Sequence, residues 1–248
     1  MKNLGKRFLA LVVCAITCTA VAFAAVSYSV WSPTYTGRDN LKFHCRTSIN
    51  SVRGDIYGTG TTVTTDSTKV PKGYAGVTAK LYRNDSALFT EVGFNQGVST
   101  GVTVTTPDTN ASGKFYTGGY GHFQSTASGA MLDVDLPISP VFQNGSISAV
   151  QYLDMIDDPG VQVNENNETY ASSLYADLND VEVDLVSVWG VNGNRGYIRT
   201  SDEPKLPDTP EEAANFDIEG YTIPVYASDG VTVIDSYRYG GGSVEDIK

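Results

Sequence analysis

Residues 69–94 read KVPKGYAGVTAKLYRNDSALFTEVGF, and the segment VTAKLYRN within them indicates the fold class most clearly. In this segment Val77, Ala79 and Leu81 alternate with larger or polar side chains. Successive side chains of a β-strand point to opposite faces, so this period of two predicts a strand with one buried face. Turn-forming residues bound the strand, Pro71-Lys72-Gly73 before it and Asn84-Asp85 after it.

The same alternation recurs on both sides of this segment, in a region rich in Ser, Thr, Gly, Tyr and Val. It returns at residues 41–47, at 102–104 and, with a break in the period, at 131–136. Gly, Pro, Asn and Asp residues separate these short runs. Such spacing predicts a mainly β chain, with an antiparallel β-sandwich domain over residues 25–143.

The amino-terminal residues 1–24 have the pattern of a secretory signal peptide. Lys2, Lys6 and Arg7 precede an apolar run that closes on Ala22-Phe23-Ala24. A basic start, a short apolar stretch and a small-x-small site are typical of an exported protein, and the stretch is too short for a comfortable membrane span. Cys14 and Cys18 lie in this run without a lipidation motif, so we expect simple export rather than a lipid anchor.

Charge and cysteine content narrow the function classes. The formal net charge is −11, which argues against nucleic-acid binding and against adhesion to anionic lipid, since both need basic patches. No apolar run after the signal peptide is long enough to span a bilayer. After cleavage only Cys45 remains, so we expect no internal disulfide. Cys45 alternates with Leu41 and Phe43, which predicts a buried core thiol.

Residues 144–180 differ from the strands before them. Apolar residues follow helical spacings from Ala149 to Ile156 and again from Tyr170 to Leu178. We predict a helical connector with one or two short helices here.

Residues 181–240 predict a small α+β module. The runs at 181–191 and 196–200 indicate two strands, and YTIPVYA and VTVIDSYRY around Ser228-Asp229-Gly230 indicate a hairpin. Between them Thr209-Pro210-Glu211-Glu212 combines a capping residue, an early proline and a capping-box glutamate, which predicts a helix start.

The expected order of this module is ββαββ. Residues 241–248 lack apolar side chains in a buriable pattern, and we predict a flexible tail.

Two stretches resemble known families. Residues 69–94 and SGKFYTGGYGHFQ at 112–124 resemble exported proteins of Gram-positive bacteria and, distantly, the lactococcin 972-like bacteriocins, although GGYGHFQ departs from their Tyr-Asn-Gly segment. Residues 184–240 resemble a module of exported Firmicute proteins and of the extracellular ends of some BlaR1-type membrane proteins. The resemblance implies an exported protein of a Gram-positive bacterium and carries over no catalytic or binding residue.

Aromatic residues form the main candidate binding site. Phe115, Tyr116, Tyr120 and Phe123 interleave with glycines, and exposed rings on a sheet can stack on sugars. The alternative is that these rings fill the core of the sandwich. The single residues Trp31 and Trp189 are expected in the core.

The sequence predicts no catalytic residues, no metal and no cofactor. Its two histidines, His44 and His122, have no metal-ligand spacing with Cys45, and no GxSxG motif is present. Asp133 and Asp135 would share a strand face, as the paired carboxylates of a glycoside hydrolase must, but such pairs occur by chance in an acidic protein.

One acidic group has the residue types that bind calcium. Asp154, Asp157 and Asp158 cluster near Glu165, without the alternating ligand ladder of an EF-hand loop. We therefore interpret this group as solvated surface.

These observations predict a secreted, non-enzymatic protein that binds an envelope protein or glycan, possessing no nucleic-acid partner and no membrane span in its mature part. The alternatives are a bacteriocin-like effector or accessory protein, and a hydrolase that uses carboxylates. The sequence does not identify the partner or the oligomeric state.

Overall fold

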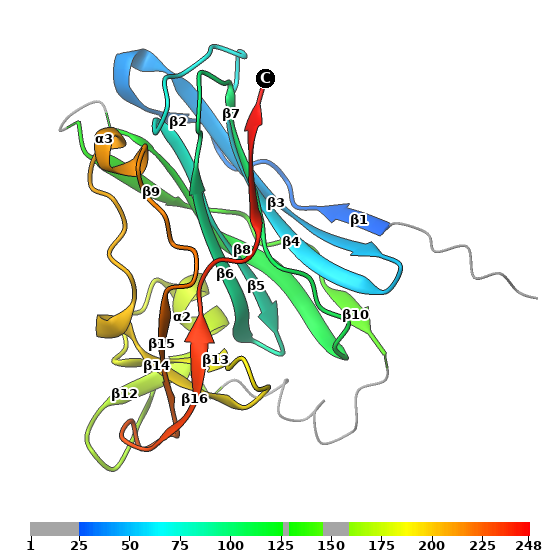
Figure 1. Cartoon of the computed structure of the whole chain (residues 1–248), viewed down its shortest axis with the longest axis vertical. Helices are drawn as coiled ribbons and strands as arrows, with labels where there is room; N and C mark the ends of the chain where they lie inside the picture. Colours follow the sequence, from blue (N-terminus) through cyan, green and yellow to red (C-terminus); the bar gives the residue numbers. More distant parts are fainter. Residues whose placement is uncertain (1–24, 126–128, 146–158) are drawn as a thin grey trace, which may run out of the picture.

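The computed structural model describes residues 25–125, 129–145 and 159–248, and strands dominate this part of the chain (Figure 1). The predicted signal peptide 1–24 and the predicted connector helix at 149–156 lie outside the described residues. The prediction of a mainly β chain is confirmed: one sheet is antiparallel and the other is mixed.

The first sheet is antiparallel throughout, with the order β1-β3-β4-β7-β17 and with β2 paired to β3. Its strands are β1 (Ala25–Tyr28), β2 (Tyr35–Thr36), β3 (Lys42–Val52), β4 (Asp55–Thr64), β7 (Gly101–Thr105) and β17 (Ser243–Ile247).

The second sheet has the main order β10-β8-β5-β6-β13-β14-β15-β16, and β9, β11 and β12 branch from it. Its strands are β5 (Ala75–Arg83), β6 (Ser86–Phe94), β8 (Gly113–Gln124), β9 (Met131–Asp135), β10 (Phe142–Asn144), β11 (Gln162–Val163), β12 (Thr169–Ser172), β13 (Leu185–Trp189), β14 (Arg195–Arg199), β15 (Thr222–Tyr226) and β16 (Val233–Arg238). Strand β13 runs parallel to both β6 and β12, whereas the other pairs are antiparallel.

The two sheets meet at an apolar core. Phe43 and Cys45 of β3 join Val77 of β5 and Phe123 of β8 in one buried cluster, and Phe43 stacks on Phe123 with ring centroids 4.8 Å apart. Gly121 allows the close approach, because a Cβ there would lie 2.6 Å from the Cys45 sulfur. The prediction that Cys45 is a core thiol is confirmed, and burial raises its pKa to about 11.

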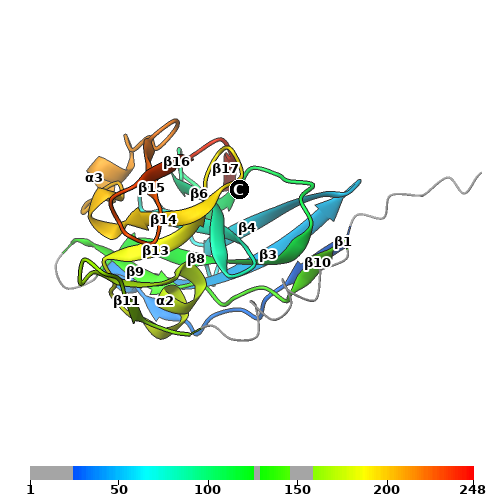
Figure 2. The same ribbon diagram turned by 90° about the horizontal axis from the view of Figure 1, so that it is seen from below.

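The opposite face of the second sheet is covered by later parts of the chain. A second buried cluster joins β5 and β6 to the strands β13 to β16 and to the helices α2 (Ser173–Asn179) and α3 (Pro210–Ala213). In Figure 2 the strands β13 to β16 lie on the left, away from β1 and β3 on the right. The second sheet therefore contains strands from both halves of the chain, and the carboxyl-terminal strands do not form a sheet of their own.

Local signals set the helices. Thr209 caps α3 by accepting a hydrogen bond from the Glu212 N–H at 3.3 Å, as the sequence predicts. The Glu212 carboxylate accepts from the Asp208 N–H at 2.9 Å, one residue before the cap. Two short 3-10 turns, η1 (Arg38–Asn40) and η2 (Thr200–Asp202), complete the elements outside the sheets.

The second connector helix begins later than its apolar spacing predicts. Tyr170 lies in β12, and α2 starts only after Ser172, whose hydroxyl accepts from the Tyr175 N–H at 3.1 Å. Pairing of β12 with β13 takes the backbone of Tyr170 into the sheet.

The prediction of a flexible tail over 241–248 is wrong for β17. This strand pairs with β7 along its whole length, from Ser243 opposite Thr105 to Ile247 opposite Gly101 (Figure 1, red). Val244 packs into the core, where the missing side chain of Gly93 leaves room for it. Pairing with β7 and partial burial of Val244 therefore hold this segment in the first sheet.

Candidate functional site

The four aromatic residues proposed from the sequence divide between the two faces of β8. Phe115 and Phe123 are 0% exposed and point toward the first sheet. They cannot contact a ligand, which corrects the prediction for these two rings. Tyr116 and Tyr120 lie on the opposite face and are half-buried, because side chains alternate along the strand.

The expectation for the tryptophans is also corrected in part. Trp31 lies outside any strand and is 39% exposed rather than in the core. Trp189 is half-buried, and its indole N–H donates to the Arg83 carbonyl at 2.9 Å.

Tyr120 borders a pocket between the outer face of the second sheet and the strands that cover it. The pocket, here called the Tyr120 pocket, has a volume of about 80 Å³. Its wall combines apolar side chains with a few polar ones: Thr78, Lys80, Ala87, Thr90, Val92, Tyr120, Val186, Val188, Ile198, Glu203, Pro204, Leu206, Tyr237 and Tyr239. A mainly apolar wall with a small number of convergent polar groups is typical of a ligand site.

Three donors converge on the carboxylate of Asp177 at the mouth of this pocket. The Lys80 ammonium lies 3.0 Å from both carboxylate oxygens, and the Tyr120 hydroxyl donates to Oδ1 at 2.8 Å. The Tyr82 hydroxyl donates to Oδ2. Asp177 comes from α2, so this cluster fixes the helix to strands β5 and β8.

The charged groups at the pocket mouth shift the pKa values of Lys80 and Glu203. Burial opposes the charged form of Lys80, but the carboxylates of Asp177 and Glu203 outweigh it, so the pKa of Lys80 is raised. Partial burial raises the pKa of Glu203, although Lys80 acts against this shift. Glu203 is exposed as a residue, and we place it at the rim. Its carboxylate makes no hydrogen bond or ion pair with any residue in the described ranges.

A wider acidic hollow opens beside the Tyr120 pocket, with a volume of about 610 Å³. It shares Lys80, Tyr120, Val186 and Glu203 with the pocket and is further lined by Thr169, Ala176, Asp177, Asp180, Val181, Glu182, Val183, Asp184 and Thr200. Five of its lining residues are acidic and one is basic. The hollow therefore favours cationic groups.

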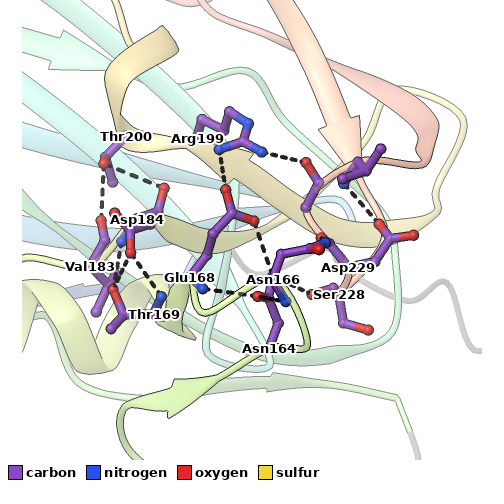
Figure 3. Close-up of polar contacts among 12 residues, drawn as sticks. Asn164, Asn166, Glu168, Thr169, Val183, Asp184, Arg199, Thr200, Ser228 and Asp229 are labelled. Atoms are coloured by element: carbon purple, nitrogen blue, oxygen red, sulfur yellow. Dashed lines mark hydrogen bonds and ion pairs between the residues drawn. The ribbon is translucent and has the colours of Figure 1, made fainter.

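A polar network closes one end of the hollow (Figure 3). The Asp184 carboxylate accepts from the Thr169 N–H at 2.8 Å and from its hydroxyl at 2.7 Å. Glu168 pairs with Arg199 and also accepts from the Asn164 side-chain amide at 3.1 Å. Since these acids have partners, the network holds the β11–β12 connection in place. Asp180, Glu182 and Glu203 remain open for a ligand.

His122 forms a second polar chain behind the pocket. Its Nδ1 lies 2.6 Å from Asp133 Oδ1, and its Nε2 lies 2.8 Å from the Thr78 hydroxyl. The hydrogen bond from His122 lowers the pKa of Asp133, so the carboxylate accepts and Nδ1 carries the proton. The Thr78 hydroxyl then donates to Nε2, in the order of a nucleophile, a base and an orienting acid.

In the Thr78–His122–Asp133 chain the nucleophile should be accessible to a substrate, but it is buried. Thr78 is 4% exposed and His122 is 1% exposed, whereas the Asp133 side chain is 54% exposed. Asp135, the other acid of the proposed hydrolase pair, is exposed and does not contact His122. The hydroxyl that would attack is thus buried, and only the orienting acid is open to solvent.

The remaining sequence candidates do not assemble into a site. His44 and Cys45 point to opposite faces of β3. Of the acidic group weighed for calcium, Asp154, Asp157 and Asp158 lie outside the described residues, and Glu165 is exposed beside the small hollow at Asn164. Among the described residues no cluster of His, Cys, Asp and Glu has the arrangement of a metal site.

Sequence reasoning missed Lys80 and Asp177. Lys80 lies between Thr78 and Tyr82 on the polar face of β5. The alternation along this strand predicts that position. Asp177 lies 97 positions from Lys80, and nothing in its own neighbourhood indicates the pairing.

Comparison with protein-family models, with curated proteins and with solved structures finds no match to this chain. The resemblances stated above stay predictions. None of the helices in the described ranges has the length and apolar character needed to cross a bilayer.

Proposed function

We propose that the chain is an exported, non-enzymatic protein that binds a partner in the Gram-positive envelope. In this proposal residues 25–143 form a β-sandwich, residues 181–240 add a ββαββ module, and the Tyr120 pocket lies where the module covers the sheet. The observation that carries the proposal is the convergence of Lys80, Tyr120 and Asp177 where that pocket meets the wider acidic hollow.

The chemistry of the site indicates a ligand with an amine next to an apolar group. The apolar wall accepts the apolar part, and the carboxylates of Asp180, Glu182 and Glu203 face the amine. A lysine side chain in an envelope peptide or protein has this combination. The acidity of the hollow disfavours an anionic ligand there.

The first experiment measures retention of the purified chain on isolated Gram-positive cell walls. We expect retention to fall when a lysine-containing peptide competes, and to be unaffected by the same peptide with its lysine Nε-acetylated. Glu203→Gln should weaken binding about tenfold, which corresponds to one lost charge-assisted contact. Glu211→Gln, an equal charge change in α3 outside the pocket, is the matched control.

Equal retention of the Glu203 and Glu211 variants would exclude the Tyr120 pocket as the binding site. A zone of killing around the purified protein would support the bacteriocin-like alternative instead.

The alternative of a hydrolase that uses the Asp133 and Asp135 carboxylates stays a prediction. A different hydrolase, with Thr78 as nucleophile, is favoured by one observation, the Thr78–His122–Asp133 chain. It predicts turnover in a screen of esters, peptides and glycans that Thr78→Val abolishes. We favour binding because Thr78 is enclosed, and turnover with this dependence would overturn that choice.

A further inference from the structure

A ladder of stacked side chains lies on the outer face of the first sheet, far in sequence from the Tyr120 pocket. The Arg46 guanidinium lies 4.3 Å from the ring centroid of Tyr28 and 4.3 Å from that of Trp31. Trp31 stacks on His44 with centroids 3.8 Å apart and planes 9° from parallel. Burial and the nearby Arg46 charge lower the pKa of His44, so its ring is neutral near neutral pH.

The rings of this ladder are open to solvent and held in place. Tyr28 is 53% exposed and Trp31 is 39% exposed. The backbone that carries them follows β3, because the Ser29 N–H donates to the Thr47 carbonyl at 3.0 Å and the Ser32 N–H donates to the Cys45 carbonyl at 2.8 Å. Rings fixed by the backbone lose little conformational entropy when a flat ligand stacks on them.

Arg46 has no counter-ion among the described residues. Its Nε atom is buried without a hydrogen-bond partner, and no carboxylate within the described ranges pairs with its guanidinium. Planar guanidinium groups bind carboxylates through two parallel hydrogen bonds. The site should therefore bind an anionic ligand.

Hydroxyl groups continue from the ladder across the sheet. Thr61 of β4 lies opposite Arg46, and Thr103 of β7 lies opposite Thr61. The two threonine hydroxyls are 3.1 Å apart, and both residues are half-buried. A flat face with aromatic rings at one edge and hydroxyls beyond them matches the alternating apolar and polar faces of a sugar chain.

We propose that Tyr28, Trp31 and Arg46 form a binding surface for an acidic polysaccharide, a pyranose chain bearing carboxylates. The exposed face of Tyr28 stacks on a pyranose ring and the exposed edge of Trp31, whose faces are covered by His44 and Arg46, contacts the next sugar. The guanidinium pairs with a sugar carboxylate, and Thr61 and Thr103 bind hydroxyls. This surface lies on a different sheet from the Tyr120 pocket and takes a ligand of opposite charge. The chain would therefore have two binding sites for two components of its surroundings.

The two tryptophans of the chain allow a direct test. In a Trp189→Phe background, Trp31 is the sole tryptophan, and its fluorescence reports on the surface itself. We expect saturable quenching by oligogalacturonate and at least tenfold weaker quenching by a neutral cello-oligosaccharide of equal length. Arg46→Met should remove this preference for the acidic chain.

Calorimetry with oligogalacturonate provides the control that does not depend on fluorescence. Trp31→Ala should abolish the binding heat while leaving the melting temperature within a few degrees, since the ring is exposed. Binding that survives Trp31→Ala, equal binding of both sugars, or no binding of either would overturn the proposal. Glu203→Gln should leave this binding unchanged, so failure here and failure of the Tyr120 pocket are distinguishable.

Discussion

The two faces of β5 and β8 come from the same two strands and differ in almost every property. The face toward the first sheet contains Val77, Ala79 and Phe123, all of them fully buried. The face toward α2 contains Lys80 and Tyr120, which are tied to a carboxylate and border a pocket. One residue step along a strand therefore separates the stabilising core from the candidate site.

This difference shows how the fold holds a polar site without disulfides among its described residues. The apolar face buries enough surface against the first sheet to fix the strands. The other face also packs against a buried apolar cluster, and beside that cluster it holds the charged pair of Lys80 and Asp177, which we expect to contribute less stability. We expect substitutions on the two faces to have unequal effects, and the predictions below test this from the largest effect to the smallest.

The largest effect is expected at Phe123. Phe123→Ala removes a ring that stacks on Phe43 in the core, and a cavity of this kind costs about 3–5 kcal/mol of unfolding free energy. Urea denaturation measures the change, with Phe123→Leu as the control, because leucine leaves a smaller cavity and should cost less. A loss below about 1 kcal/mol for Phe123→Ala would mean that this face is not the stabilising one.

An intermediate effect is expected at Asp177. Asp177→Ala leaves the Lys80 ammonium partly buried without its anion, which we expect to cost about 2 kcal/mol, because exposure of 15% and 18% weakens the pair. The double variant Lys80→Met, Asp177→Leu should recover most of this loss. Equal stabilities of the single and double variants would show that the pair has no structural coupling and that the two faces differ less than proposed.

The alternation around Val77 was enough to predict both faces of β5. It predicts the buried apolar residues correctly, and it also predicts that Lys80 lies on the opposite face of the strand. The same rule, applied to β8, separates Tyr116 and Tyr120 from Phe115 and Phe123. Because side chains alternate along a strand, the four rings cannot form one site on a single face of β8.

Other features could not be predicted from local pattern. The Asp177 partnership depends on where α2 packs, and the ordering of β17 depends on β7 having a free edge. The sequence predicts Trp31 in the core, yet it lies after β1 on a segment that follows β3 along its solvent side. Each of these depends on contacts between segments distant in sequence, which propensity and periodicity do not report.

The smallest effect concerns Glu91, the one carboxylate that breaks the apolar face. It lies opposite Ala79 on β6, is buried, and accepts a hydrogen bond from the Gly242 N–H at 2.6 Å, next to β17. Burial, together with the nearby charges of Glu219 and Asp217, raises its pKa from 4.5 to about 6, against the lowering effect of the Gly242 bond.

A folded-state pKa above the unfolded value means that the native chain holds this proton more tightly. The contribution of Glu91 to stability is therefore full below about pH 4.5 and is lost as the pH rises through 6, with a total of at most about 2 kcal/mol. Glu91→Gln keeps an acceptor for Gly242 and removes the titration, so its unfolding free energy relative to the parent should rise across this range. Urea denaturation at pH 4.5, 5.5 and 7 measures the difference. A difference that does not change with pH would mean that Glu91 is hydrated in the folded chain, and the contrast between the two faces would then be weaker at the β17 edge.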